Sequence, residues 1–81
     1  MKYEFTDRFV KSYKTFNKEV QLKFDKQLKY LIDNINHPSL HSKKYDESKD
    51  IWQARVDQNV RFYFIIKDDV YILVNIKNHP K

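Results

Sequence analysis

The second half of this sequence alternates between apolar and polar residues over three consecutive segments. Successive side chains of a β-strand point to opposite faces of a sheet, so a period of two is typical of strands with one buried face. The pattern predicts an antiparallel meander of three strands, and a further short strand is expected over residues 43–46. The apolar positions are Trp52, Ala54 and Val56, then Val60, Phe62, Phe64 and Ile66, and finally Val70, Ile72, Val74 and Ile76.

The first half has apolar residues every three or four positions, which is the spacing of one helix face. Lys2 to Thr6 are expected to form a short edge strand, and Asp7 to cap a first helix that is broken near Asn17. A second helix is expected to end at His37-Pro38. The two apolar stripes comprise Phe9, Val10, Tyr13 and Phe16, and Val20, Phe24, Leu28, Leu31, Ile32 and Ile35.

Together these patterns predict an α+β fold in a single domain of residues 1–81. A short N-terminal strand and a helical hairpin are expected to pack on the antiparallel meander.

Glycine is absent from the chain, so its turns must be built from Asn and Asp, which tolerate left-handed backbone best after glycine. A three-residue loop Asp57-Gln58-Asn59, with Asn59 left-handed, places Val56 opposite Val60 and Arg55 opposite Arg61. Both arginines then leave the sheet on the face away from the aromatic core. Like charges that face each other destabilise a sheet, so an anion bound between them relieves a cost.

The turn after Lys67 leaves two registers open. A three-residue loop Lys67-Asp68-Asp69, which we expect, places Arg61 opposite Asn75 and Phe62 opposite Val74. A two-residue Asp68-Asp69 turn exchanges the two faces of the last strand, so that Tyr71 and Leu73 point toward the core. Both residues are apolar and therefore compatible with it. By the alternation of side chains along the last strand, His79 is expected on the same face as the two arginines.

Composition excludes several kinds of site. Without glycine there is no phosphate-binding glycine loop, and without cysteine there is no disulfide or thiol nucleophile. No His, Asp and Glu spacing resembles a metal site, and no apolar run has the length of a membrane span, so an intracellular protein is expected. The net charge of +5 favours an anionic partner, either nucleic acid or an acidic protein.

Four features of the sequence match the pattern of a known family. They are the order of elements, the HPSL segment, the run DIWQARVDQNVRFYFIIKDDVYILVNI and a histidine near the end of the sequence. Together they resemble the RelE/ParE superfamily of bacterial toxin-antitoxin toxins, over nearly the whole chain. The most specific part, from Ile51 to Ile76, is similar to the ribosome-dependent mRNA interferases, the RelE-like and YoeB-like branch.

The resemblance implies a cytoplasmic, metal-independent endoribonuclease without a cofactor. It would cut mRNA in the A site of the ribosome, next to 16S rRNA, by attack of the ribose 2′-hydroxyl, and an acidic antitoxin would neutralise it. Arg61 matches the arginine that contacts the scissile phosphate, Arg55 lies nearby, and His79 matches the histidine of the catalytic face. Positional candidates for catalysis or substrate binding are Lys43, Lys44, His41 and Lys77, with Asp46 and Glu47 as weaker ones.

The chain departs from the family pattern at its end. Many members have a glycine before the histidine and an aromatic residue after it, whereas this sequence reads Asn78-His79-Pro80-Lys81. Two alternatives therefore stay open: a ParE-like toxin that inhibits gyrase, and a catalytically weak toxin homologue that serves as an antitoxin-binding module.

Overall fold

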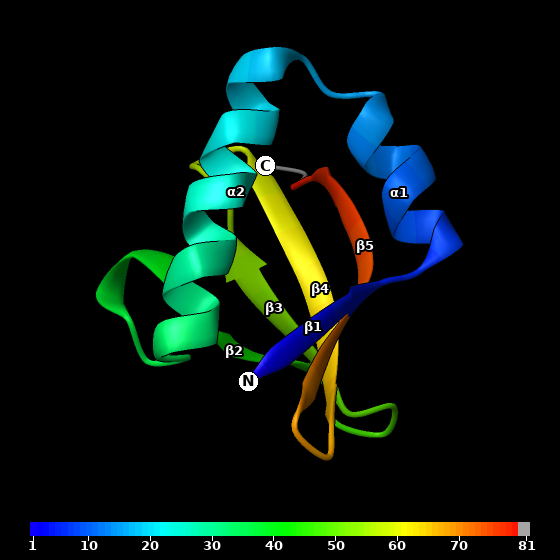
Figure 1. Ribbon diagram of the computed structural model, residues 1–81, viewed down its shortest axis with the longest axis vertical. Helices are drawn as coiled ribbons and strands as arrows, with labels where there is room; N and C mark the ends of the chain where they lie inside the picture. Colours follow the sequence, from blue (N-terminus) through cyan, green and yellow to red (C-terminus); the bar gives the residue numbers. More distant parts are fainter. Residues whose placement is uncertain (80–81) are drawn as a thin grey trace.

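The computed structural model describes residues 1–79 and contains five strands, two α-helices and one short 3₁₀ helix (Figure 1). In chain order these are β1 (Lys2–Phe5), α1 (Asp7–Lys14), α2 (Lys18–Asp33), η1 (Pro38–Leu40), β2 (Lys43–Asp46), β3 (Ile51–Arg55), β4 (Val60–Lys67) and β5 (Val70–Asn78). The predicted α+β fold is confirmed, and so is the short strand over residues 43–46. Pro80 and Lys81 lie outside the described residues.

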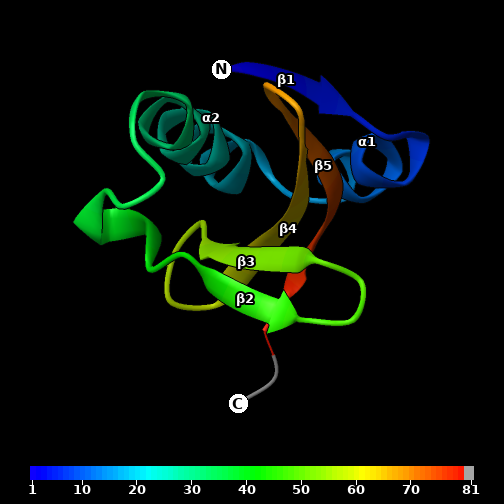
Figure 2. The ribbon, with the colours of Figure 1, turned by 90° about the horizontal axis from the view of Figure 1, so that it is seen from below.

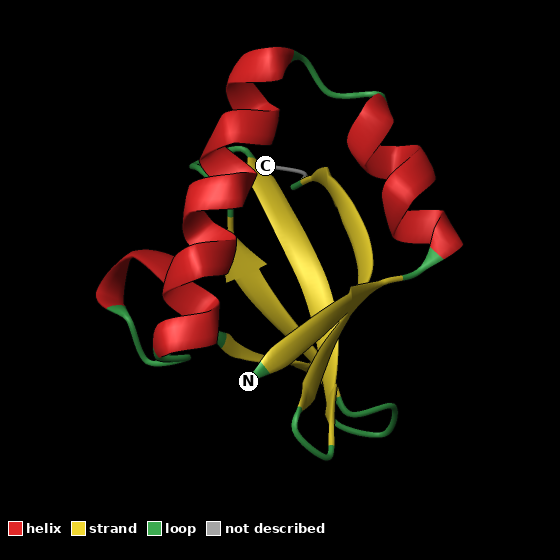
Figure 3. Ribbon diagram, in the orientation of Figure 1, coloured by secondary structure: helices red, strands yellow, loops and turns green. Residues whose placement is uncertain are grey.

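The five strands form one sheet in the order β1-β5-β4-β3-β2. Strand β1 pairs in parallel with β5, while the other pairs are antiparallel, so the sheet is mixed at this edge. Both helices cover the same face of the sheet, and the opposite face, which we call the arginine face, carries no helix (Figures 2 and 3). No helix within residues 1–79 is long and apolar enough to cross a membrane.

Polar caps define where the helices begin. Thr6, and not Asp7 as expected, is the N-cap of α1, because its hydroxyl accepts a hydrogen bond from the backbone N–H of Phe9 at 3.2 Å. Asp7 is the first helical residue, where the positive end of the helix dipole stabilises its negative charge. Asn17 caps α2 in the same way, so the break between the two helices lies where the sequence predicts it.

The helix α2 ends earlier than expected. Its last residue is Asp33, and Asn34 follows as an extended C-cap, so the helix stops before the His37-Pro38 pair. Pro38 instead begins η1, with His37 as its cap. The fixed φ of proline suits this first helical position.

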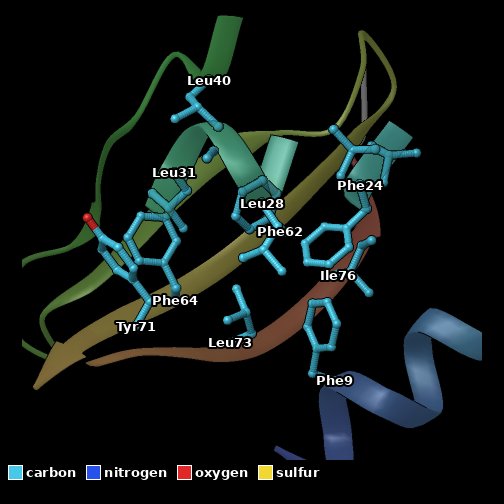
Figure 4. Packing of buried hydrophobic residues seen from close by; sticks show 13 residues of the cluster. Phe9, Phe24, Leu28, Leu31, Leu40, Phe62, Phe64, Tyr71, Leu73 and Ile76 are labelled. Atoms are coloured by element: carbon cyan, nitrogen blue, oxygen red, sulfur yellow. The ribbon is translucent and has the colours of Figure 1, made fainter. Parts of the chain in front are cut away.

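The core lies between the helices and the sheet and is rich in phenylalanine (Figure 4). Phe24 of α2 contacts Phe9 of α1 and Phe62 of β4, with ring centroids 5.1 and 5.2 Å apart. Such tilted and edge-on pairs are favoured arrangements of aromatic rings. The fully buried side chains are Phe9, Phe24, Phe62, Phe64, Leu31, Leu40, Leu73 and Ile76.

The hairpin between β3 and β4 has the predicted register. Arg55 pairs with Arg61 and Ala54 pairs with Phe62, while the N–H of Val56 donates to the carbonyl of Val60 at 2.9 Å. The expectation that Asn59 is left-handed is wrong, since the positive φ angles in the described residues are at His41, Asp50 and Asp68. The Asp57 carboxylate closes the loop instead.

The hairpin between β4 and β5 has the two-residue turn, so the expected three-residue loop is wrong. Lys67 pairs with Val70, and Asp68 takes the left-handed conformation with φ of 55°. Together with a bulge in β5, this turn places Arg61 opposite Lys77, and not opposite Asn75.

A β-bulge at Val74 explains why the apolar pattern of β5 was ambiguous. Phe64 pairs with Leu73 and Tyr63 pairs with Asn75, so Val74 is an extra residue between them. A bulge changes the parity of a strand. Leu73 and Ile76, an odd number of residues apart, are therefore both buried in the core.

Two leucines on α2 provide a test of this packing. Leu31 is fully buried and Leu22 is 56% exposed. We predict that Leu31→Ala lowers the free energy of unfolding by about 2–5 kcal/mol, because it leaves a cavity in the core. Leu22→Ala is the control and should change it by less than about 0.5 kcal/mol. Urea unfolding followed by circular dichroism measures both, and equal effects would contradict the described core.

Candidate functional site

A pocket of about 390 Å³ opens on the arginine face, at the end of the sheet that carries the β3–β4 turn. We call it the arginine pocket. Its walls come from the loop after η1, from β2, β3 and β4, and from the residue after β5: His41, Ser42, Lys43, Gln53, Arg55, Arg61 and His79. The family resemblance implies three of these at the site, Arg61, Arg55 and His79, and Lys43 and His41 were positional candidates.

Arg61 is held firmly in this pocket. It is 7% exposed, and its Nη1 donates to the carbonyl of Asp57 at 2.6 Å and to that of Val60 at 3.2 Å. Both bonds use Nη1, so within residues 1–79 the Nε and Nη2 groups have no protein acceptor. A guanidinium fixed in this way presents its remaining donors to an anion without further ordering.

The turn that holds Arg61 is organised by the side chain of Asp57. Its Oδ1 accepts hydrogen bonds from the backbone N–H groups of Asn59 at 2.8 Å and Val60 at 2.9 Å. Its Oδ2 lies 3.6 Å from Nζ of Lys23 on α2. This one aspartate therefore shapes the turn and links it to the helical layer.

Arg55 is positioned through its backbone by a buried glutamine. Nε2 of Gln27 donates to the carbonyls of Arg55 at 2.9 Å and Ser39 at 3.0 Å, while the Ser39 hydroxyl donates to Oε1 of Gln27 at 2.9 Å. Gln27 is 7% exposed, so these bonds satisfy an amide that would be costly to bury alone. They tie α2, η1 and β3 together beneath the arginine pocket.

Three cations lie side by side across the strands. Arg55 of β3 faces Arg61 of β4, which faces Lys77 of β5. Like charges in directly opposed positions repel one another, and the repulsion falls when an anion binds or when salt screens it. The row is therefore a concentration of positive charge on this face of the sheet.

His79 reaches the arginine pocket from the end of β5. Its backbone N–H donates to the carbonyl of Asn59 at 2.7 Å, which fixes it beside the β3–β4 turn. Its side chain is exposed, and it shares the pocket with both arginines.

The loop after η1 supplies one wall of the pocket. His41 has a left-handed φ of 48°, which turns the chain from η1 into β2. The buried Oγ of Ser42, the next residue, has no hydrogen-bond partner among residues 1–79. Ser42 and Gln53 line the pocket but were not among the expected residues; Gln53 shares the parity of Arg55, which was the signal available for it.

Lys44 does not line the arginine pocket, so its choice as a candidate for that site is wrong. It pairs with Trp52 on the helix-covered side of β2, so it points away from Lys43. Its Nζ bonds to the carboxylate of Asp50 and lies 5.3 Å from the centre of the Trp52 ring. The bond to Asp50 raises the pKa of Lys44, which opposes a role as a general base.

The weaker acidic candidates also lie outside the arginine pocket. Asp46 accepts hydrogen bonds from Ser48 and from the N–H of Lys49, and these bonds lower its pKa. Glu47 belongs to the turn after β2, where its carbonyl accepts from the N–H of Asp50. Within residues 1–79, no group of three His, Cys, Asp or Glu side chains is arranged to hold a metal ion.

The like-charge row predicts a salt-dependent effect on stability. Arg55→Gln should raise the free energy of unfolding by roughly 0.2–0.5 kcal/mol at low ionic strength, because it removes repulsion with Arg61. The gain should vanish in about 1 M NaCl, where screening is strong. Lys67→Gln is the matched control, since Lys67 faces Val70 and no cation. A gain of the same size at both salt concentrations would contradict the electrostatic explanation; urea unfolding measures it.

Comparison with known proteins finds similarity in structure alone. No protein-family model matches the sequence, and no curated protein is similar enough in sequence to count as a relative. The chain is similar in structure to a YoeB/ParE toxin from Agrobacterium tumefaciens, with a TM-score of 0.82 and 12% identity over 99% of this chain and 100% of the other.

Two structures from Staphylococcus aureus are equally informative. A YoeB dimer superposes with a TM-score of 0.82 and 18% identity, over 99% of this chain and 98% of the other. A heterotetrameric YoeB-YefM toxin-antitoxin complex gives a TM-score of 0.79 at 18% identity, with the same coverage. At these identities the likeness shows the fold alone, so this chain has the fold of these YoeB toxins.

Proposed function

We propose that this chain is the toxin of a type II toxin-antitoxin system, a single domain of residues 1–81 that cleaves mRNA in the ribosomal A site. The observation that carries the proposal is the arginine pocket, in which Arg55, Arg61, Lys43 and His79 line one cavity. No carboxylate lines that pocket among the described residues. Its shape and charge suit a phosphodiester, and the fold shared with YoeB toxins supports the choice.

In the proposed reaction the ribose 2′-oxygen attacks phosphorus. The P–O2′ bond forms and the P–O5′ bond breaks, which leaves a 2′,3′-cyclic phosphate and a 5′-hydroxyl. Negative charge grows on the non-bridging oxygens as phosphorus becomes five-coordinate. The free Nε and Nη2 donors of Arg61, fixed by the bonds of Nη1, would stabilise that charge, with Arg55 beside them.

Proton transfer falls to the other side chains of the pocket. His79 is proposed as the general acid that protonates the leaving O5′, because imidazole exchanges protons readily near neutral pH. Lys43 or His41 would take the 2′-proton, since both line the same pocket. In this scheme protein cations supply the positive charge, and the reaction uses no metal and no cofactor.

The proposed partner is an acidic antitoxin, as in the YoeB-YefM toxin-antitoxin complex. A net charge of +5 favours an acidic polypeptide, which would cover the arginine face and block its access to RNA. The same basic face would contact mRNA and 16S rRNA in the cytoplasm.

The first functional prediction concerns Arg61. Expression of the chain alone should arrest growth and produce cuts within translated mRNA, whereas Arg61→Ala should reduce cleavage by about 10²–10³-fold, because it removes the main transition-state donor. Primer extension on programmed ribosomes measures the rate, and circular dichroism confirms that the variant is folded.

Lys67→Ala is the control, since Lys67 lies exposed on the same strand, β4. A folded Arg61→Ala variant with the wild-type rate would refute the assigned role. Relaxed plasmid DNA with intact transcripts would move the assignment to a gyrase inhibitor, and absence of toxicity would favour the binding module.

The second prediction concerns His79. Its replacement by Gln, and a chain that ends at Asn78, should each lower cleavage by roughly 10²-fold or more, because both remove the proposed acid. The measurement is single-turnover cleavage on programmed ribosomes. His37→Gln is a matched control, because His37 does not line the arginine pocket. Its ring stacks on that of Tyr30, with the ring centroids 3.9 Å apart. Equal rates for all four proteins would remove His79 from the reaction.

A further inference from the structure

A second and larger hollow lies next to the arginine pocket on the same face of the sheet. Its volume is about 670 Å³. We call it the tyrosine hollow, because Tyr45 and Tyr63 meet in it. Its lining also includes Asp46, Val74, Asn75 and Lys77.

Two β-bulges build this hollow. In β2 the register shifts between Lys44 and Asp46, so Tyr45 is an extra residue, and both Tyr45 and Asp46 line the hollow. In β5 the extra residue is Val74, and both Val74 and Asn75 line it. A bulge places two residues opposite one and re-aims their side chains, and bulges occur preferentially beside active sites.

The two tyrosines pack edge to face, with a cation beside them. Their ring centroids are 4.9 Å apart at an interplanar angle of 64°, and Nζ of Lys77 lies 5.1 Å from the Tyr63 ring and 6.0 Å from the Tyr45 ring. Tyr63 is 4% exposed and supports the pair, whereas Tyr45 is 54% exposed. An exposed aromatic ring among cations is the arrangement on which unpaired nucleobases stack.

The polar groups of the hollow suit a base better than a phosphate. Asp46 contributes an anionic carboxylate, which would repel a phosphate. Asn75 accepts from the Ser12 hydroxyl at 3.1 Å and from the N–H of Ile76 at 2.9 Å, both through Oδ1. Among residues 1–79 its Nδ2 donates to no protein group, so both of its N–H donors are available to a ring nitrogen or a carbonyl oxygen of a base.

The distance from the arginine pocket fits one step along an RNA strand. Tyr63 follows Arg61 by two residues on β4 and points to the same face, which places them roughly 7 Å apart along the strand. The base of the nucleotide whose phosphate lies at Arg61, or the base of the next nucleotide, can reach Tyr45 over that distance.

We propose that the tyrosine hollow binds one unpaired nucleobase next to the phosphate held by Arg61, stacked on Tyr45 and flanked by Lys77. This rests on the proposed function, which supplies the RNA. The hollow would set which nucleotide of the chain lies in the arginine pocket, so Tyr45 acts as a positioning residue.

Binding of short single-stranded RNA tests the proposal without relying on cleavage. The probe is a hexamer with 2′-O-methyl groups, which lacks the attacking hydroxyl, and its partner is a base-free hexamer with the same backbone. NMR titration measures Kd into the millimolar range. The wild-type protein should bind the hexamer with bases about tenfold or more tightly than the base-free one.

Three variants separate stacking from other effects. Tyr45→Leu should lose the preference for the hexamer with bases, and Tyr45→Trp should keep it, because indole also offers a stacking face. Tyr3→Leu is the matched control, since Tyr3 is 47% exposed on β1 and lies outside the hollow. The base-free hexamer should bind all four proteins equally.

The proposal is overturned if wild type shows no base-dependent binding, or if Tyr45→Leu retains it. Because neither hexamer can be cleaved, a protein that binds bases through Tyr45 but cuts no mRNA would overturn the proposed nuclease and keep the base site. Cleavage that depends on Arg61, together with RNA binding that does not depend on the bases, would overturn the base site and keep the proposed nuclease.

Discussion

The carboxylate of Asp57 is the interaction on which the candidate site depends. It closes a turn without glycine by accepting two backbone N–H groups, and it reaches Lys23 of α2. The turn sets the register of β3 against β4, so Ala54 and Phe62 face the core while Arg55 and Arg61 face outward together. The carbonyl of the same aspartate accepts from Arg61, so one residue fixes both the register and the orientation of the central cation.

The two bulges explain how so small a sheet buries an aromatic core and still presents a shaped polar face. If β5 were a regular strand with no bulge at Val74, Leu73 and Ile76 would point to opposite faces, and one of them would leave the core. The change of parity keeps both in the core and brings Asn75 and Lys77 to the arginine face. Core packing and the geometry of the site thus have the same cause.

Much of this arrangement could be predicted from the sequence, because period and turn chemistry are local signals. The Arg55–Arg61 pair followed from parity and from an Asp-Gln-Asn loop, and His79 followed from its distance along the last strand. The β4–β5 register did not follow, because Tyr71, Leu73, Val74 and Ile76 are all apolar and a bulge leaves no mark in such a run. Lys44 was a positional candidate from the family resemblance, and the sequence did not show which face it occupies, because its partner strand sets the register of the four-residue β2. Gln27 was missed because a polar residue on a helix is buried only by tertiary contacts.

The central claim is that the arginine pocket promotes attack by a ribose 2′-hydroxyl on the adjacent phosphate. The most direct test is to map the cut on a ribosome-bound mRNA and then remove that one hydroxyl, with a 2′-deoxynucleotide on the 5′ side of the scissile bond. The account predicts that cleavage at this bond is abolished, and that the unmodified mRNA yields a 2′,3′-cyclic phosphate and a 5′-hydroxyl. Cleavage of the deoxy-substituted bond at the original rate, or a 5′-phosphate on the product, would contradict it.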